Sequence, residues 1–234
     1  MPLDLAIILP VYNEQASVRK VVLEWFQEIE NWTENFTFLC LNDGSTDDTL
    51  KILNRLRDQL GPRLEILTHA NRGHGQTCLA GYRLACERQI HHILQIDSDG
   101  QCDPQYFFRF WRLREKFDVI YGVRTRRDDG WRRVLASLIL KTVLLATQRV
   151  HCADANVPYR LIRTEKLLPI LEKIPSDFFL ANIAFAVLLK KSRWTHHHIP
   201  IRFRERYGGE PSVKLGKFSE KAVELVTQLS KIKI

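Results

Sequence analysis

The first hundred residues alternate short apolar runs with longer segments in which apolar residues have a helical spacing. The runs LAIILP, FTFLCL, LEILTH and HHILQI have the length and composition of buried strands. The segments between them predict helices over 14–30, 49–60 and 76–88. Because strands that alternate with helices pair in parallel, we expect an α/β fold. Its sheet would be Rossmann-like, mostly parallel and flanked by helices on both faces.

The second half is less regular but continues the same alternation. FDVIYGV, VPYRLIR and THHHIPIRF predict further strands, and FFLANIAFAVLLKK predicts an apolar helix. A long apolar helix with basic ends is expected over 131–150, and a last helix is expected from about residue 218. The sequence shows no internal repeat, low-complexity tract or linker, so we expect a single domain over residues 1–234.

Composition narrows the class of protein. The five cysteines include no CxxC pair, and their odd number argues against a disulfide framework or a structural zinc site. A reducing, cytoplasmic location fits this pattern. The N-terminal run lacks the basic region of a signal peptide, and no stretch reaches the roughly 18 apolar residues of a membrane span. The net charge of +8 favours anionic partners, such as nucleic acid, anionic lipid or phosphorylated substrates.

Polar loops follow the apolar runs. PVYNE, NDGSTDD and DSDGQCD each stand at the carboxyl end of a predicted strand. In a parallel sheet these ends lie along one edge, where ligands bind. The loop ANRGHGQ adds glycines, which permit positive φ and close approach of the backbone. We therefore expect loops that are far apart in the sequence to converge in space.

The last of these loops holds two closely spaced acids. On a strand that continues, the side chains of Asp97, Asp99 and Gln101 lie on one side. Oxygen ligands at that spacing suit Mg²⁺ or Mn²⁺. An EF-hand is excluded, because a cysteine and a phenylalanine occupy its glycine and terminal acidic positions. From this stretch alone, a metal site and a solvated turn both remain open.

Four motifs in order carry a family resemblance. ILPVYNE, LNDGSTDDT, NRGHGQ and IDSDGQCDP resemble glycosyltransferase family 2 of the GT-A fold, and especially its dolichol- and polyprenol-phosphate hexose synthases. The resemblance covers about residues 5–218. It implies inverting transfer of a hexose from a GDP- or UDP-sugar to a polyprenyl phosphate, assisted by Mg²⁺ or Mn²⁺. It also implies a nucleotide-sugar-binding half over about 1–104 and an acceptor-binding half over about 105–234.

The resemblance also implies roles for individual residues. The positions that match nucleotide-sugar contacts are Pro10, Tyr12, Glu14, Asp43, Arg72, Gly73, Asp97, Ser98 and Asp99. The metal would be held by Asp99 and Gln101. Asp47 and Asp103 are expected to cap helices instead. His74 stands where the family often has a small residue or lysine, so we expect a structural role for it.

The acceptor half matches the family at basic positions. The residues that align with phosphate contacts are Arg124, Arg132, Arg133, Arg206, Ser212 and Lys214. A phosphate acceptor is already anionic near neutral pH, so the site needs cations to position it rather than a general base. The residues expected to carry catalysis are Asp97, Asp99, Arg124, Asp154 and Arg206. The loop FRERYGGEPSVKL is longer than the family's F-x-x-R-x-x-G-E-S-K pattern by Pro211 and Val213.

A lipid acceptor implies contact with a membrane. The helix over 131–150 combines apolar residues with basic and aromatic ends, which suit either a core helix or an interfacial one. We expect a peripheral protein on the cytoplasmic face of a membrane, with a membrane-anchoring partner subunit as one means of attachment. An alternative is transfer to a carbohydrate or protein hydroxyl, with Asp154 as the base. Nucleic-acid binding is disfavoured, because no RRM, KH or zinc-finger signature occurs.

Overall fold

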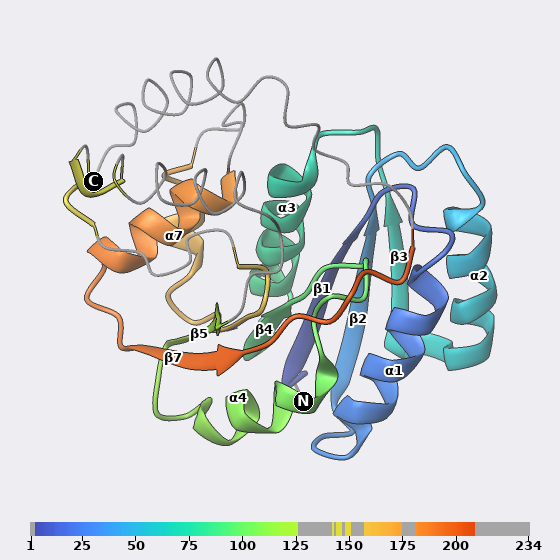
Figure 1. The fold of residues 1–234 in the computed structure, drawn as a ribbon, viewed down its shortest axis with the longest axis horizontal. Helices are drawn as coiled ribbons and strands as arrows, with labels where there is room; N and C mark the ends of the chain where they lie inside the picture. Colours follow the sequence, from blue (N-terminus) through green and yellow to red (C-terminus); the bar gives the residue numbers. More distant parts are fainter. Residues whose placement is uncertain are drawn as a thin grey trace.

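A seven-stranded sheet forms the centre of the protein (Figure 1). The computed structural model describes residues 3–125, 142, 144–146, 148–150, 157–174 and 181–208. The strands follow the order β3-β2-β1-β4-β6-β5-β7 across the sheet. Their bounds are Leu5–Val11 (β1), Phe36–Asn42 (β2), Leu64–Thr68 (β3), His92–Gln95 (β4), Val119–Arg124 (β5), Arg160–Arg163 (β6) and His196–Ile201 (β7).

The sheet is mostly parallel, as predicted. Strand β1 pairs in parallel with β2 and β4, β2 pairs in parallel with β3, and β5 pairs in parallel with β7. Within the described residues, β6 alone is reversed, because it pairs antiparallel with both β4 and β5. The carboxyl ends of β1, β2 and β4 therefore lie along one edge, where the polar loops begin.

Helices cover both faces of the sheet, which also confirms the prediction. Their bounds are Val18–Glu30 (α1), Thr49–Leu60 (α2), His74–Glu87 (α3), Phe107–Leu113 (α4), Leu168–Leu171 (α6) and Ala181–Lys191 (α7). Helices α1 and α2 contact each other, and α3 contacts α6 and α7. This grouping follows from the strand order: β1, β2 and β3 step outward, and the chain then crosses back to β4, which places α3 on the opposite face.

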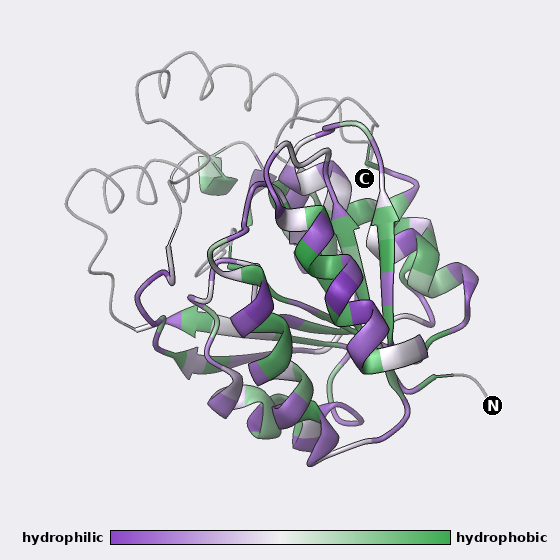
Figure 2. Cartoon of the chain, turned by 90° about the vertical axis from the view of Figure 1, so that its right-hand side faces the viewer, coloured by the Kyte–Doolittle hydropathy of each residue, from purple (hydrophilic) through white to green (hydrophobic). Residues whose placement is uncertain are grey.

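Aromatic residues join the two halves of the chain. The Trp25 ring of α1 lies 5.3 Å from that of Tyr159 in an edge-to-face contact. On the other face, Tyr82 of α3 and Phe185 of α7 lie 5.0 Å apart. Figure 2 shows hydrophobic residues along the strands and alternating hydrophobic and hydrophilic bands along the helices, as expected for elements that bury one face.

Two predicted helix starts were wrong, and one predicted strand end shifted by a residue. Helix α1 begins at Val18 rather than at residue 14, because Glu14 turns inward and its backbone N–H donates to Thr49 Oγ1 at 2.9 Å. Helix α3 begins at His74, two residues before the prediction, after Gly73 with a φ of 83°. Strand β4 ends at Gln95, one residue before the predicted end, so the acids beyond it do not follow the alternation of a strand.

Two predicted helices fall mostly or wholly on residues that the structure does not describe. Most of the helix expected over 131–150, and all of the one expected from about 218, lie outside the described residues. In the part of the chain that the structure describes, no helix has both the length and the apolar character needed to cross a membrane.

Candidate active site

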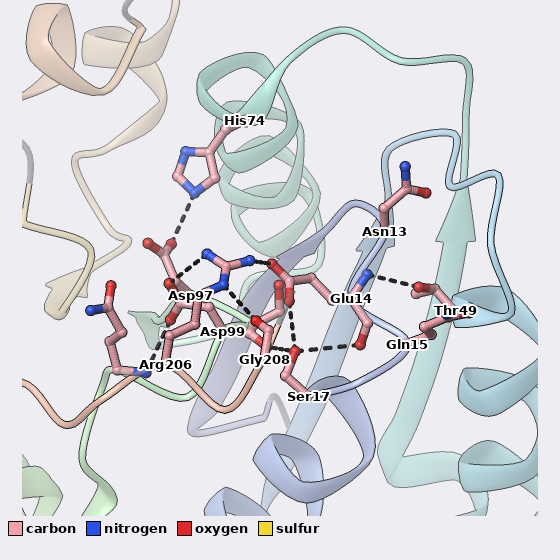
Figure 3. A network of polar contacts seen from close by, with 12 residues as sticks. Asn13, Glu14, Gln15, Ser17, Thr49, His74, Asp97, Asp99, Arg206 and Gly208 are labelled. Atoms are coloured by element: carbon pink, nitrogen blue, oxygen red, sulfur yellow. Dashed lines mark hydrogen bonds and ion pairs between the residues drawn. The ribbon is translucent and has the colours of Figure 1, made fainter. Parts of the chain in front are cut away.

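Three acids from two loops meet at the carboxyl edge of the sheet. Glu14 comes from the turn after β1, and Asp97 and Asp99 come from the loop after β4 (Figure 3). We call these three residues the acid cluster. Residues 202–208, which follow β7, lie against this cluster and are called the strap. The convergence expected from the sequence is therefore present, although a segment from the far end of the chain completes it.

Hydroxyl groups join the first and last of the polar loops. Ser98 Oγ donates to the Pro10 carbonyl oxygen at 2.9 Å. Ser17 Oγ lies 2.6 Å from Glu14 Oε2 and 2.9 Å from the Ser98 carbonyl oxygen. Both serines are buried, so these bonds fix the Glu14 carboxylate beside the loop that follows β4, which we call the acid loop. Ser98 and Pro10, two of the predicted nucleotide-sugar contacts, bond to each other here.

Asp43 organises the glycine-containing loop. Its carboxylate accepts hydrogen bonds from the backbone N–H groups of Arg72 at 2.7 Å and of Gly73 at 3.0 Å. The side chain is buried, and the two bonds hold the turn that leads into α3. The side chains of Arg72 and Tyr12 are both exposed. The predicted contacts of these residues with a nucleotide sugar stay predictions.

A turn, rather than a strand, brings the acids together. Asp99 Oδ1 accepts a hydrogen bond from the Gln101 backbone N–H at 3.0 Å, and Gly100 adopts a φ of +86° between them. Strand alternation, which predicted a shared side for Asp97, Asp99 and Gln101, therefore does not apply here, since the strand has already ended. Local hydrogen bonding by aspartate favours such turns.

Burial makes the acid cluster electrostatically costly. Burial raises the pKa of Asp99 to about 6, and the Asp97 charge adds to this, while the Gln101 N–H and Arg206 act in the opposite direction. Burial likewise raises the pKa of Glu14, although Ser17 and Arg206 lower it. Carboxylates gathered in this way favour a cationic partner.

Arg206 of the strap supplies a positive charge to the acid cluster. Its Nη1 lies 3.3 Å from Asp99 Oδ2, and its Nη2 is paired with Glu14 Oε1 (Figure 3). The strap backbone also pairs with the acid loop, because the Tyr207 N–H donates to the Asp99 carbonyl oxygen at 3.0 Å. The Tyr207 hydroxyl then donates to Glu24 of α1 at 2.8 Å. Arg206, which was predicted to bind the acceptor phosphate, is therefore held directly at the acids.

Gly100 provides a test of this packing. A Cβ at Gly100 would lie 2.4 Å from Tyr207 Cδ2, whereas one at Gly61 meets no atom within 4 Å, although both residues have positive φ. We expect Gly61→Ala to lower the free energy of unfolding by about 1–3 kcal/mol through backbone strain alone. Gly100→Ala should lose about 1–3 kcal/mol more, from overpacking. Urea denaturation measures both, and equal losses would contradict the strap contact.

The donor atoms fit a divalent cation that is shared with a ligand. Within the described ranges, no three His, Cys, Asp or Glu residues are arranged as a complete metal site. Mg²⁺ commonly binds through one or two carboxylates together with substrate phosphates, so a complete protein cage is not required. Asp99, buried among other acids and beside Gln101, has the oxygen chemistry for such a shared site.

His74, for which the sequence predicts a structural role, reaches the acid cluster. Its Nε2 lies 2.9 Å from Asp97 Oδ1. Burial lowers the pKa of His74, but Cys78 and Asp97 outweigh this and raise it well above its ordinary value. In the sequence, the signal for this contact was the position of His74, directly after Gly73 in a loop that was expected to converge with the acids. That signal did not specify the direction of the ring.

The remaining predicted residues fall into two groups. Arg124 ends β5, with its guanidinium 5.2 Å from the Phe203 ring at the start of the strap. The others lie outside the described residues, namely Arg132, Arg133, Asp154, Ser212 and Lys214. The predicted cap at Asp103 is confirmed, because its side chain accepts from the Gln105 N–H at 3.0 Å. The N-cap residue of α2 is Asp48 rather than Asp47, although Asp47 accepts from the Thr49 N–H at 3.0 Å.

Comparison with known proteins identifies the family. The family model described as glycosyl transferase family 2 matches residues 6–167, which span the acid loop and six of the seven strands. The chain belongs to glycosyltransferase family 2. This membership confirms the resemblance of the four motifs and identifies the protein as a glycosyltransferase.

Relatives within glycosyltransferase family 2 extend along the chain. An undecaprenyl-phosphate 4-deoxy-4-formamido-L-arabinose transferase from Edwardsiella ictaluri is 23% identical over 227 residues, covering 96% of this chain and 67% of the relative. A transferase of the same name from Pseudomonas syringae pv. syringae is 30% identical over 145 residues, covering 61% of this chain and 42% of the relative.

Solved structures show that this family 2 member has the GT-A fold. Mannosyl-3-phosphoglycerate synthase from Rubrobacter xylanophilus superposes with a TM-score of 0.65 at 14% identity, covering 98% of this chain and 73% of the other. Glucosyl-3-phosphoglycerate synthase from Mycobacterium tuberculosis, in complex with Mn²⁺, UDP and phosphoglyceric acid, gives 0.66 at 16% identity, covering 100% and 79%.

Proposed function

We propose that this glycosyltransferase moves a sugar from a nucleoside diphosphate sugar to a polyprenyl phosphate. The observation that carries the proposal is the match of 96% of the chain to relatives named as undecaprenyl-phosphate sugar transferases. Arg206 supports it, because a guanidinium held at the acid cluster lies where an acceptor phosphate and a donor diphosphate would meet. The sugar named for the relatives is a modified arabinose, whereas the sequence predicts a hexose, so a donor experiment has to include both kinds of sugar.

The proposal includes a divalent cation, Mg²⁺ or Mn²⁺. A structural neighbour is described in complex with Mn²⁺ and UDP-glucose, which supports this class of cofactor. Asp99 and Gln101 would hold the ion. When bound, such an ion neutralises the negative charge that develops on the departing diphosphate.

The residues of the chain itself would orient the donor sugar and the acceptor phosphate. Asp97, which is half-buried beside His74, would accept hydrogen bonds from hydroxyls of the donor. Arg206 and Arg124 would bind and orient the acceptor phosphate, whose oxygen attacks the anomeric carbon from the opposite side and inverts it. Because that oxygen is already anionic, the reaction needs no general base.

The acceptor places this function at a membrane surface. The net charge of +8 favours anionic lipids, and the helix expected over 131–150 would supply apolar contact. We propose peripheral attachment to the cytoplasmic face, directly or through an anchoring partner subunit. Liposome flotation with anionic and neutral vesicles measures direct attachment, and a protein that floats with neither requires the partner.

A two-step experiment tests the proposed function. Thermal shift with GDP, UDP and their mannose, glucose and formamido-arabinose conjugates identifies the donor, because ligands that bind the native state stabilise it. The selected donor is then incubated with a short polyprenyl phosphate or with an oligosaccharide. We expect a glycosylated polyprenyl phosphate. Product on the oligosaccharide alone would reject the proposal and favour a hydroxyl acceptor, with Asp154 as the base.

Cation binding should depend on pH. Since burial raises the pKa of Asp99 to about 6, a proton occupies this carboxylate below that pH and competes with a cation. We expect the Mn²⁺-induced rise in melting temperature to be largest near pH 7.5 and to decline through pH 6. Thermal shift over this range measures it, with Asp99→Asn as a variant in which the decline is absent. A shift independent of pH in the native protein would contradict the site.

A further inference from the structure

A chain of hydrogen bonds links the acceptor half to the acid cluster. Asn182 near the start of α7 places its Nδ2 at 3.3 Å from His74 Nδ1, and His74 Nε2 lies 2.9 Å from Asp97 Oδ1. We call these three residues the His74 bridge. Its members come from α7, from the first residue of α3 and from the loop after β4. Figure 3 shows the His74 ring directed toward Asp97.

The Asp97 carboxylate fixes the direction of one hydrogen bond in the bridge. The carboxylate accepts, so His74 Nε2 carries a proton and donates to Asp97, while the Asn182 side-chain amide lies within hydrogen-bond distance of Nδ1. Both nitrogens of the ring are therefore satisfied. One oxygen of Asp97 is engaged, and within the described chain no other side chain bonds to Oδ2. The bridge therefore holds the carboxylate in place and leaves its Oδ2 able to accept a hydrogen bond from a ligand.

The burial pattern argues against a role in packing alone. The His74 side chain is 49% exposed, so it adds little to the core. Asn182 is 5% exposed, and among the residues that the structure describes its Oδ1 has no hydrogen-bond partner. A buried polar atom without a partner destabilises a protein, so an apolar residue would pack more favourably at this place. The amide therefore acts through the ring that it orients.

We propose that His74 is a positioning residue that aims the Asp97 carboxylate at hydroxyl groups of the nucleotide sugar, with Asn182 setting the angle of the ring. This inference rests on the proposed function. It predicts that His74 contributes to donor affinity through Asp97 and Asn182 rather than by its own contact with the donor. It also connects α7 of the acceptor half with the geometry of the donor site.

The test measures equilibrium affinity for the nucleotide sugar selected by the donor panel. We expect His74→Ala to weaken it roughly 10- to 100-fold, the range for removal of a partner that orients a ligand-binding group. His74→Gln, whose amide still donates toward Asp97, should recover affinity to within about threefold of the wild type. His91→Ala is the matched control: His91 is exposed at the opposite end of β4, and this variant should bind like the wild type.

Two double-mutant cycles separate positioning from direct contact. Asn182→Ala should weaken binding about threefold in the wild type and not at all in His74→Ala. His74→Ala should add less than about twofold to the loss caused by Asp97→Asn. Independent losses in the Asn182 cycle, or failure of His74→Gln to recover affinity, would overturn the inference. A wild type that binds no nucleotide sugar would instead reject the proposed function, so the two failures are distinguishable.

Discussion

Replacing Asp99 by asparagine should reduce sugar transfer by at least about 100-fold, the scale on which loss of one preorganised electrostatic group acts. The substitution keeps the shape of the side chain and its bond from the Gln101 N–H, but it removes the charge that would hold the cation. Steady-state turnover with the selected donor and a polyprenyl phosphate measures this loss. Excess Mg²⁺ or Mn²⁺ should not restore activity.

The same variant should be more stable than the wild type. The folded state raises the pKa of Asp99 to about 6, so it binds a proton more tightly than the unfolded chain does. The ionised carboxylate therefore lowers the free energy of unfolding as pH rises from about 4 to 6, and the full cost remains at pH 7.5. Asparagine removes about 1–3 kcal/mol of this cost. The gain should vanish below pH 4.

Asp103→Asn serves as the matched control for both measurements. Asp103 lies in the same loop and caps the turn that begins at Pro104 through its bond from the Gln105 N–H. Because asparagine also caps well, activity and stability should both stay close to those of the wild type. If Asp99→Asn retained full turnover, the assignment of the metal and of the donor site to this loop would be wrong.

Arg206→Ala should lower turnover by about 100-fold or more, because it removes the cation expected to orient the acceptor phosphate. It should also destabilise the protein without ligand. Glu14 is buried, and breaking its pair with Arg206 leaves an uncompensated carboxylate, which costs about 2–4 kcal/mol for partly buried groups. The loss of stability should be smaller in saturating Mn²⁺, since the cation then faces the same acids. Urea denaturation with and without Mn²⁺ measures the difference.

Arg204→Ala provides the comparison within the strap. Arg204 pairs with Glu24 at 2.8 Å, away from the acid cluster, and both side chains are 29% exposed. A pair with this exposure contributes up to about 1 kcal/mol, so the variant should retain most of its stability and turnover. Equal losses in the two variants would show that the strap matters through its packing and not through the charge of Arg206.

Local pattern was sufficient for the sheet and for the polar loops. The apolar runs of β1 and β2 are buried along their whole length, and such runs are specified by composition alone. The cap at Asp103 was also predictable, because its hydrogen bond joins residues that are two positions apart. The start of α1 was not, since it depends on a bond between Glu14 and Thr49, 35 residues along the chain.

The sequence by itself determined the family, the order of the elements and the acids at the end of β4, since each is written in short-range composition and spacing. Only the tertiary structure decided the partners of those acids. Arg206 lies 107 residues from Asp99, and Asn182 lies 108 residues from His74. Side-chain direction at such separations is set by how the helices and the strap pack onto the sheet, and one-dimensional spacing carries no record of that packing.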